Sequence, residues 1–162
     1  MNIIEFTEDD FKDVCTIYAE GIATGIATFE TSVPAWPKWD QSHLPFGRIA
    51  AIEYDRMLGW AALSAVSDRC VYGGVAEVSV YVAQQARRRG VGRLLMQKLI
   101  EISERHNIWT LQSGVFRANE ASIELHKRCG FRFFGYREKI GKLNGEWLDN
   151  VLLERRSVIV GI

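Results

Sequence analysis

The sequence predicts an α/β fold, a mixed sheet flanked by helices, built as a single domain over residues 1–162. Short runs rich in β-branched residues alternate with stretches in which apolar residues recur at helical spacing. The length of 162 residues corresponds to about one domain. Hydrophobic residues make up 48% and charged residues 25%, which is typical of a globular domain and argues against intrinsic disorder.

Capping residues, apolar periodicity and the distribution of proline indicate the elements of the first half. A threonine followed three residues later by an aspartate precedes an apolar periodicity, which indicates a helix start. All three prolines fall in one stretch, which predicts a surface excursion. The predicted elements are, in order, a strand over Asn2–Phe6, a helix that follows Thr7 and Asp10 and buries Phe11, Val14, Cys15 and Tyr18, an excursion over Thr31–Gly47 with a helical turn around Trp36–His43, and strands over Arg48–Tyr54 and Leu58–Val66.

The second half continues the alternation of strands and helices. β-branched residues favour strands, and a glycine at the end of a helical periodicity marks a helix C-terminus. The predicted elements are a strand over Val75–Val82, a helix with Val91, Leu94, Leu95, Leu99 and Ile102 on one face, a buried strand over Thr110–Val115, a helix over Ala121–Cys129 that ends at Gly130, and strands over Phe131–Phe134 and Trp147–Leu153 around a turn at Asn144-Gly145.

Charge and cysteine content exclude several classes of protein. The 20 basic and 20 acidic residues give a formal net charge of zero, so a nucleic-acid partner is not expected. The three cysteines are far apart and the histidines lack metal-ligand spacing, so we expect no metal site. No stretch approaches the roughly 18 apolar residues of a membrane helix, and the acidic N-terminal residues show no signal peptide. We therefore expect a cytoplasmic protein without a membrane partner.

The segment that carries chemistry lies between the strand Val75–Val82 and the helix that begins near Val91. The turn Arg87–Gly92, which consists of Arg87, Arg88, Arg89, Gly90, Val91 and Gly92, is basic and contains two glycines. Backbone N–H groups at a helix start, together with the helix dipole, bind anions such as phosphate. A solvated surface turn is the alternative interpretation.

The sequence resembles the GNAT family of N-acetyltransferases. The family signature Arg/Gln-x-x-Gly-x-Gly/Ala is matched by Arg87, Gly90 and Gly92, and a second family segment resembles Asn119–Phe131. The resemblance implies a mostly antiparallel central sheet, acetyl-CoA as cosubstrate and no metal. It also implies that the amides of the Arg87–Gly92 turn cradle the CoA pyrophosphate and that the backbone of Val80, Tyr81 and Val82 pairs with the pantetheine arm. Asn119, as a CoA contact or a helix cap, and Ser122 are further candidates for the cofactor site.

A narrower resemblance concerns the phosphinothricin and methionine sulfoximine N-acetyltransferases. It is carried by Ala27–Thr31 with Pro34 beyond, by Glu77–Val82, by His126 and by Trp147–Asp149. This resemblance implies acetylation of the α-amine of a small glutamate-like or methionine-like amino acid, and a homodimer. The sequence departs from this branch at Arg88 and Arg89 and in the Trp- and Pro-rich stretch Trp36–Pro45.

Two residues are candidates for proton transfer. An amine that attacks a thioester must first lose a proton, which requires a base. Glu77 is the leading candidate, because partial desolvation among apolar neighbours would raise its pKa. His126 could donate a proton to the departing thiolate or relay one. The alternatives are a Glu77 carboxylate paired with an arginine and a His126 ring that serves only in packing.

The substrate carboxylate requires a cation, for which Arg69 is the candidate, with Tyr72 in the same loop. Phe29 and Glu30 are candidates for lining the acceptor site, with core packing and surface exposure as their respective alternatives.

Three other functions stay open at this point. The acceptor could be another amine, such as a peptide N-terminus, a polyamine or an aminoglycoside. The protein could instead be a non-catalytic sensor of acyl-CoA. A nucleic-acid patch at Arg87–Arg93 is disfavoured by the zero net charge.

Overall fold

A computed structural model describes all residues, Met1–Ile162. Its centre is one seven-stranded sheet with the strand order β1-β2-β3-β4-β5-β7-β6. Only the β4–β5 pair is parallel, which confirms the predicted mixed, mostly antiparallel sheet. The strands are β1 (Asn2–Glu5), β2 (Ile49–Glu53), β3 (Arg56–Ala65), β4 (Val75–Val82), β5 (Thr110–Phe116), β6 (Arg132–Leu143) and β7 (Glu146–Arg156).

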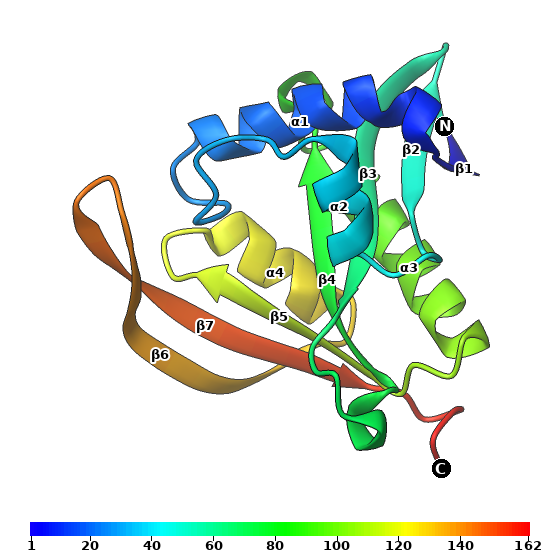
Figure 1. Cartoon of the computed structure of the whole chain (residues 1–162), viewed down its shortest axis with the longest axis vertical. Helices are drawn as coiled ribbons and strands as arrows, with labels where there is room; N and C mark the ends of the chain where they lie inside the picture. Colours follow the sequence, from blue (N-terminus) through cyan, green and yellow to red (C-terminus); the bar gives the residue numbers. More distant parts are fainter.

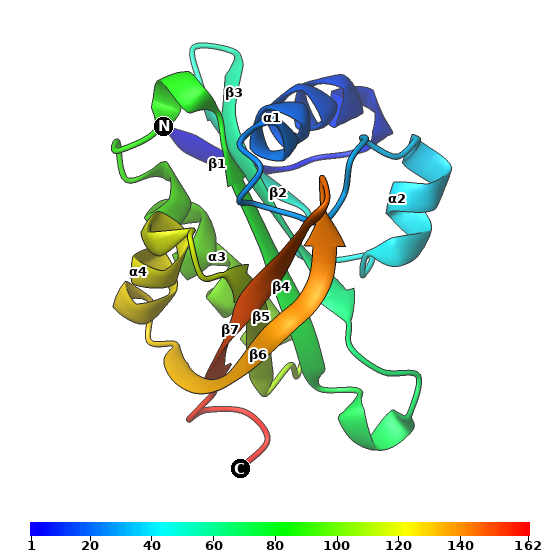
Figure 2. The same cartoon turned by 90° about the vertical axis from the view of Figure 1, so that its left-hand side faces the viewer.

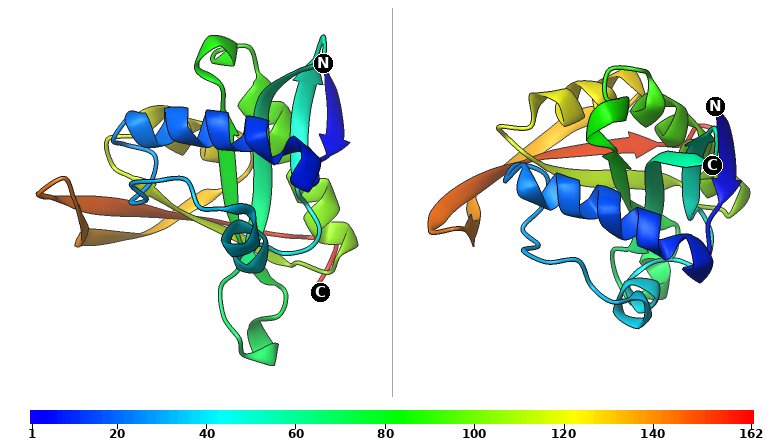
Figure 3. Two further views of the ribbon diagram at one scale, coloured as in Figure 1. Left: turned by 45° about the horizontal axis from the view of Figure 1, so that its top comes forward. Right: turned by 90° about the horizontal axis from the view of Figure 1, so that it is seen from above.

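Helices cover both faces of the sheet. The helices α1 (Phe11–Ala23) and α2 (Trp36–Ser42) lie on one face, and α3 (Val91–Arg105) and α4 (Glu120–Arg128) lie on the other (Figures 1 and 3). Three short 3-10 helices complete the chain: η1 (Glu8–Asp10), η2 (Cys70–Tyr72) and η3 (Gln84–Ala86). The predicted capping box is confirmed, because the Asp10 carboxylate accepts the Thr7 N–H at 2.9 Å. No helix is long and apolar enough to span a membrane.

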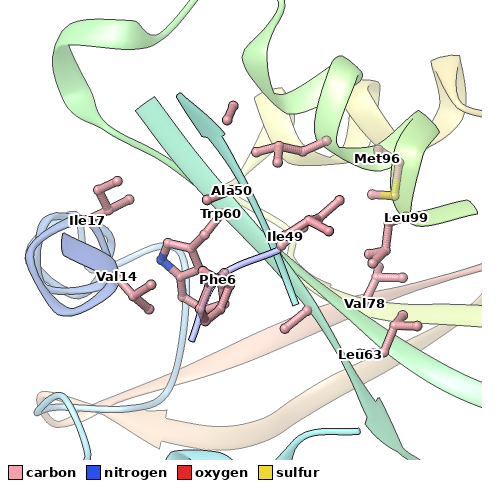
Figure 4. Packing of buried hydrophobic residues seen from close by; sticks show 14 of the residues in the cluster. Phe6, Val14, Ile17, Ile49, Ala50, Trp60, Leu63, Val78, Met96 and Leu99 are labelled. Carbon is pink, nitrogen blue, oxygen red and sulfur yellow. The ribbon is translucent and has the colours of Figure 1, made fainter. Parts of the chain in front are cut away.

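The apolar core fills the space on both sides of the sheet (Figure 4). On the α1 side, Trp60 lies with Phe6 and Val14, and on the α3 side, Leu63 lies with Leu99. Helix α2 inserts Trp39 into the first of these layers, where its side chain is only 1% exposed. The Trp-rich stretch therefore contributes to the core through Trp39.

The last two strands are longer than the sequence predicted. We expected a strand that ends at Phe134, but β6 continues to Leu143, and β7 extends from Glu146 to Arg156. Register shifts between Phe133 and Gly135 and between Arg137 and Gly141 interrupt the alternation of side chains, so the period of two is lost. The turn at Asn144-Gly145 is confirmed. The hairpin extends away from the body of the molecule in Figure 1 and points toward the viewer in Figure 2.

A fork in the sheet positions the candidate site. Strand β4 pairs with β3 as far as Val82, but it pairs with β5 only over Val75–Glu77. Strand β5 instead follows β7 as far as Phe116. Beyond Glu77, one edge of β4 therefore has no partner strand and is open to an extended ligand.

Candidate active site

The turn Arg87–Gly92 presents a series of unpaired backbone donors. The first helical hydrogen bond of α3 runs from the Leu94 N–H to the Gly90 carbonyl at 3.0 Å, and no protein group accepts the N–H of any residue from Arg88 to Arg93. Arg88 and Gly90 both have left-handed backbones, with φ of +62° and +80°. Such a series of free N–H groups at a helix N-terminus is suited to bind a phosphate or pyrophosphate.

The two glycines of this turn have different roles. The backbone at Gly90 is left-handed, which favours glycine, although a Cβ there would meet no atom within 4 Å. Gly92 instead permits close packing, since a Cβ there would lie 3.1 Å from Leu125 Cδ2 on α4 and 3.5 Å from Val82 Cγ2 on β4. Gly90 therefore shapes the anion site, and Gly92 brings α3 against α4 and β4.

The arginines of the turn are not equivalent. The Arg89 guanidinium forms an ion pair with Glu53 at 2.5 Å, beside the β2–β3 turn. Arg87 and Arg88 are exposed and form no ion pair with a protein carboxylate. Arg89 is therefore available to a ligand through its backbone, whereas Arg87 and Arg88 can also offer their charges.

The predicted helix cap at Asn119 is confirmed, and it lies beside Ser122 and His126 on α4. The Asn119 side chain accepts the Ser122 N–H at 3.2 Å. His126 is only 4% exposed, and its Nδ1 lies 2.7 Å from the Ser122 carbonyl oxygen. Because a carbonyl can only accept, Nδ1 carries the proton and Nε2 has the lone pair.

His126 Nε2 is buried and has no partner in the protein. Burial lowers the pKa of His126, with the Ser122 carbonyl acting in the opposite direction. The ring also packs edge-on against Phe131 at 5.0 Å. The neutral ring therefore presents a hydrogen-bond acceptor at Nε2.

Glu77 is the last residue of β4 that pairs with β5, so it lies at the fork of the sheet. Its side chain is accessible to solvent, but the surrounding protein desolvates the carboxylate and raises its pKa. The amide of Gln112 and the charge of Arg137 act in the opposite direction. A carboxylate with a raised pKa at the open end of a strand pair is suited to accept a proton.

Tyr81 contributes to the core through its ring. The ring lies on the α1 face, 4.8 Å from the rings of both Tyr18 and Trp60, and burial raises the pKa of its hydroxyl. Val80 and Val82 also pack against the core, and all three residues lie beyond the β4–β5 pairing. Any contact of these residues with an extended ligand at the fork would therefore use the backbone edge.

Phe29 and Glu30 follow α1 and lie on the Glu77 face of the sheet. The Phe29 ring packs edge-on against Phe116 at 4.5 Å and covers Gly141 of β6, where a Cβ would lie 2.7 Å from the ring. Glu30 is exposed, and its charge contributes to the raised pKa of Tyr81. The structure therefore brings the Phe29–Glu30 segment to the ends of β5 and β6.

Arg69 and Tyr72 lie in the loop that contains η2. The Arg69 guanidinium lies 5.5 Å from the centre of the Tyr72 ring, and both side chains are exposed. No hydrogen bond or ion pair connects either of them with Glu77, Phe29 or Glu30. The structure pairs the two residues with each other and not with the other candidates.

Three polar residues on the Glu77 face, Gln112, Arg137 and Asn150, were not predicted from the sequence. Gln112 pairs directly with Glu77, and Arg137 pairs with Asn150, whose Oδ1 is buried without a partner. The alternation in β7 could have indicated Asn150. Arg137 lies in the part of β6 that the sequence placed outside a strand, so no sequence pattern indicated it.

Comparisons with known proteins place this arrangement in a family. The profile of the Acetyltransferase (GNAT) family matches residues 14–131. A phosphinothricin N-acetyltransferase from Alcaligenes faecalis is 33% identical over 91% of this chain and 78% of its own length. An L-methionine sulfoximine/L-methionine sulfone acetyltransferase from Pseudomonas paraeruginosa is 31% identical over 65% of this chain and 62% of its own.

Solved structures show the same fold. A ribosomal-protein-alanine N-acetyltransferase from Brucella melitensis superimposes with a TM-score of 0.89 and 26% identity, covering 97% of this chain and 100% of that one. A phosphinothricin acetyltransferase from Sinorhizobium meliloti in complex with AcCoA superimposes with a TM-score of 0.87 and 25% sequence identity, covering 96% of this chain and 87% of that one. The family match and the relatives identify an acyltransferase, and the chain belongs to the GNAT family of acetyltransferases.

Proposed function

We propose that this protein transfers the acetyl group of acetyl-CoA to the α-amine of a small amino-acid-like acceptor such as phosphinothricin or methionine sulfoximine. The observation that carries the proposal is the fork: the free edge of β4 begins after Glu77 and leads toward the turn with the unpaired donors at Arg88–Arg93. The names of the relatives support the acceptor class. In this proposal the whole chain, residues 1–162, acts as one domain.

The residues at the fork fit acetyl-CoA, which supplies an activated thioester when bound. The free N–H groups of Arg88–Arg93 would bind its pyrophosphate, and the edge of β4 over Val80–Val82 would pair with its extended pantetheine arm. Asn119 and Ser122 at the start of α4 would contribute further polar contacts. The AcCoA complex of the Sinorhizobium meliloti neighbour supports this assignment.

Glu77 acts as the base in this proposal. The acceptor amine is mostly protonated at neutral pH, and it becomes a nucleophile only when a base removes a proton. The raised pKa of Glu77 makes its carboxylate a stronger proton acceptor than an exposed glutamate. If Glu77 is the base, kcat should fall on the acid side at a higher pH than it would with an ordinary glutamate, because the pKa of Glu77 is raised.

His126 is proposed as a second proton-transfer group. Its lowered pKa keeps the ring neutral at pH 7, and only Nε2 is free to react. A neutral imidazole in this tautomer accepts a proton at Nε2 and can then release it. The geometry therefore supports the relay of a proton better than its direct donation to a thiolate.

The acceptor contacts proposed from the sequence are Phe29, Glu30, Arg69 and Tyr72. The contact of Phe29 with Phe116 supports a position on the Glu77 face. Arg69 and Tyr72 form an exposed pair that is free to meet a ligand. An Arg69→Ala variant that kept its KM for the amino acid would remove the assignment of Arg69.

We also propose a homodimer in the cytoplasm. The hairpin of β6 and β7 carries large apolar side chains that are 42–57% exposed, namely Phe133, Phe134, Tyr136, Ile140 and Trp147. An exposed group of this kind is typical of a protein interface. The three free cysteines agree with a reducing compartment. Light scattering during size-exclusion chromatography tests the dimer.

Acetylation of a peptide N-terminus is the second candidate function, because the Brucella melitensis neighbour is a ribosomal-protein-alanine N-acetyltransferase. CoA release from acetyl-CoA, measured with amino acids, spermidine, an aminoglycoside and a short peptide, separates the candidates. Turnover confined to the glutamate-like and methionine-like amines supports the proposal. Turnover of the peptide alone supports the second candidate, and binding of acetyl-CoA without any turnover indicates a sensor.

A further inference from the structure

Strand alternation places three arginines of β6 and β7 on the sheet face that carries Glu77. Glu77 pairs with Gln112 of β5, Gln112 with Glu154 of β7, and Glu154 with Arg132 of β6. These four residues form one cross-strand row, the row of Glu77. Residues that pair directly in neighbouring strands project from the same face. Two further arginines follow from the same register: Arg137, which pairs with Asn150, and Arg156, which pairs with Thr110.

The guanidinium groups of two of these three arginines bind other groups of the protein. Arg132 forms an ion pair with Glu154. Arg156 donates to the carbonyl oxygens of Val160 and Gly161 near the C-terminus, at 3.0 and 2.6 Å. The side chain of Arg137 forms no hydrogen bond and no ion pair. Arg137 is therefore the one of these three guanidinium groups that is free to bind an anion.

Arg137 faces the residues of the candidate acceptor site. It pairs with Asn150, which pairs with Phe116 of β5, whose ring contacts Phe29. The Oδ1 atom of Asn150 is buried and accepts no hydrogen bond within the protein.

Two glycines and a leucine separate Arg137 from the fork. The cross-strand row between the row of Glu77 and that of Arg137 consists of Gly114, Leu152 and Gly135. A Cβ at Gly114 would lie 3.1 Å from Asn150 Nδ2 and 3.9 Å from Leu152 Cδ2, so the Asn150 amide lies next to this glycine. Within the row itself, Leu152 is the only residue with a side chain between the carboxylate and the guanidinium.

The backbone next to Arg137 is held in place from the opposite face. Asp149 accepts the Lys139 N–H at 2.7 Å and the hydroxyl of Tyr136. Lys139 has a left-handed backbone, with φ of +47°, within the irregular stretch of β6 that follows Arg137. This anchoring fixes the local course of β6 and thereby the direction of the Arg137 side chain.

We propose that Arg137 binds the α-carboxylate of the acceptor amino acid while the α-amine of the same molecule lies at Glu77. The inference rests on the proposed function and makes it more specific, because it requires an acceptor with a carboxylate next to the reacting amine. A guanidinium binds a carboxylate through two parallel hydrogen bonds, which also fixes the orientation of the molecule.

The charges on this face agree with a zwitterionic ligand. Arg137 and Glu77 form no ion pair, yet the charge of Arg137 acts on the pKa of the Glu77 carboxyl. The two groups are therefore near enough to interact and too far apart to neutralise each other. An α-amino acid between them directs its ammonium to the carboxylate and its carboxylate to the guanidinium.

The test compares the wild-type protein and the Arg137→Met variant, each with two acceptors. Initial rates of CoA release are measured for methionine sulfoximine and for its methyl ester, which lacks the negative charge. In Arg137→Met we expect KM for the free acid to rise about 10- to 100-fold, the effect of losing a charge-assisted hydrogen-bonded pair, and KM for the ester to change by less than about 2-fold. Arg137→Gln serves as a second variant in case Arg137→Met folds poorly.

A matched variant controls for the loss of a positive charge from this strand. Arg132→Met removes a guanidinium from the same strand and face that is already paired with Glu154. We expect this variant to keep the wild-type preference for the acid over the ester, with an unchanged Kd for acetyl-CoA.

Two results would overturn this assignment. One is an Arg137→Met variant whose KM for the free acid stays within about 2-fold of wild type, because a bidentate carboxylate contact contributes far more than that. The other is an equal loss with acid and ester. If the wild-type protein acetylates neither acceptor, the proposed function itself is contradicted and the role of Arg137 with it.

Discussion

The conformation of Gly90 provides a prediction whose size follows from the structure. Gly90 has a φ of +80°, and a Cβ there would meet no neighbouring atom within 4 Å. Gly90→Ala therefore introduces backbone strain without a steric clash. A left-handed conformation costs a residue with a Cβ about 1–2 kcal/mol relative to glycine. We expect a loss of about 1–2 kcal/mol in the free energy of unfolding, which corresponds to about 2–8 °C in Tm.

The strain can be relieved if the turn moves toward ordinary backbone angles. Such a movement would misalign the N–H groups that begin with Arg88, so we expect Kd for acetyl-CoA to rise about 10-fold or more. Isothermal titration calorimetry measures this Kd, and differential scanning fluorimetry measures Tm. Gly90→Asn should recover part of both losses, because asparagine tolerates the left-handed region.

Gly145 offers a matched control. It has a φ of +85° and equally open surroundings, but it lies in the turn between β6 and β7. Gly145→Ala should therefore lose similar stability and keep the wild-type Kd for acetyl-CoA. If Gly90→Ala binds acetyl-CoA as tightly as wild type, or if Gly145→Ala weakens binding equally, the reasoning about the Arg87–Gly92 turn is refuted.

Three further predictions concern proton transfer and the hairpin. Glu77→Gln should lower kcat at saturating acceptor about 100-fold or more, and a kcat near that of wild type would exclude Glu77 as the base. The same variant should have an equal or higher free energy of unfolding at pH 7, because a carboxyl with a raised pKa destabilises the fold as pH rises through its ionisation. His126→Phe should lower kcat and alter the pH–rate profile, whereas an unchanged rate and profile would leave only a packing role for the ring. Asp149→Ala should speed amide hydrogen exchange at Lys139 and raise KM for the acceptor without changing Kd for acetyl-CoA, because alanine cannot accept the Lys139 N–H, and slow exchange at Lys139 in this variant would show that Asp149 does not hold the irregular stretch of β6. In wild type the same loosening should appear only below the usual ionisation range of aspartate, because the Tyr136 hydroxyl lowers the pKa of Asp149 and the stabilisation is lost as pH falls through that lowered value.

Most regular elements could be predicted because local patterns encode them. The predicted strand over Val75–Val82 coincides with β4, and the apolar face that includes Val91 and Leu99 belongs to α3. Asn119 was recognised as a helix cap because capping depends on residues a few positions apart. The course of β6 escaped prediction, since its two register shifts and its exposed side chains remove the period of two.

The candidate site was only partly accessible from the sequence. The Arg87–Gly92 turn is a local feature, so its glycines and its position at a helix start were visible. The contacts of Glu77 with Gln112 and its proximity to Arg137 depend on the strand order β4-β5-β7-β6. That order places residues about 60 positions apart on one face, and no spacing along the chain indicates it.

The most direct test of the central claim follows the acetyl group itself. The protein is incubated with methionine sulfoximine and acetyl-CoA that carries ¹³C in its acetyl carbonyl, and the reaction is followed by NMR. We expect the label to move to an amide whose proton couples to the α-carbon proton of the amino acid, with an equal amount of free CoA. Resonances that show bound acetyl-CoA while the label stays on the thioester would contradict acetyl transfer to this acceptor class.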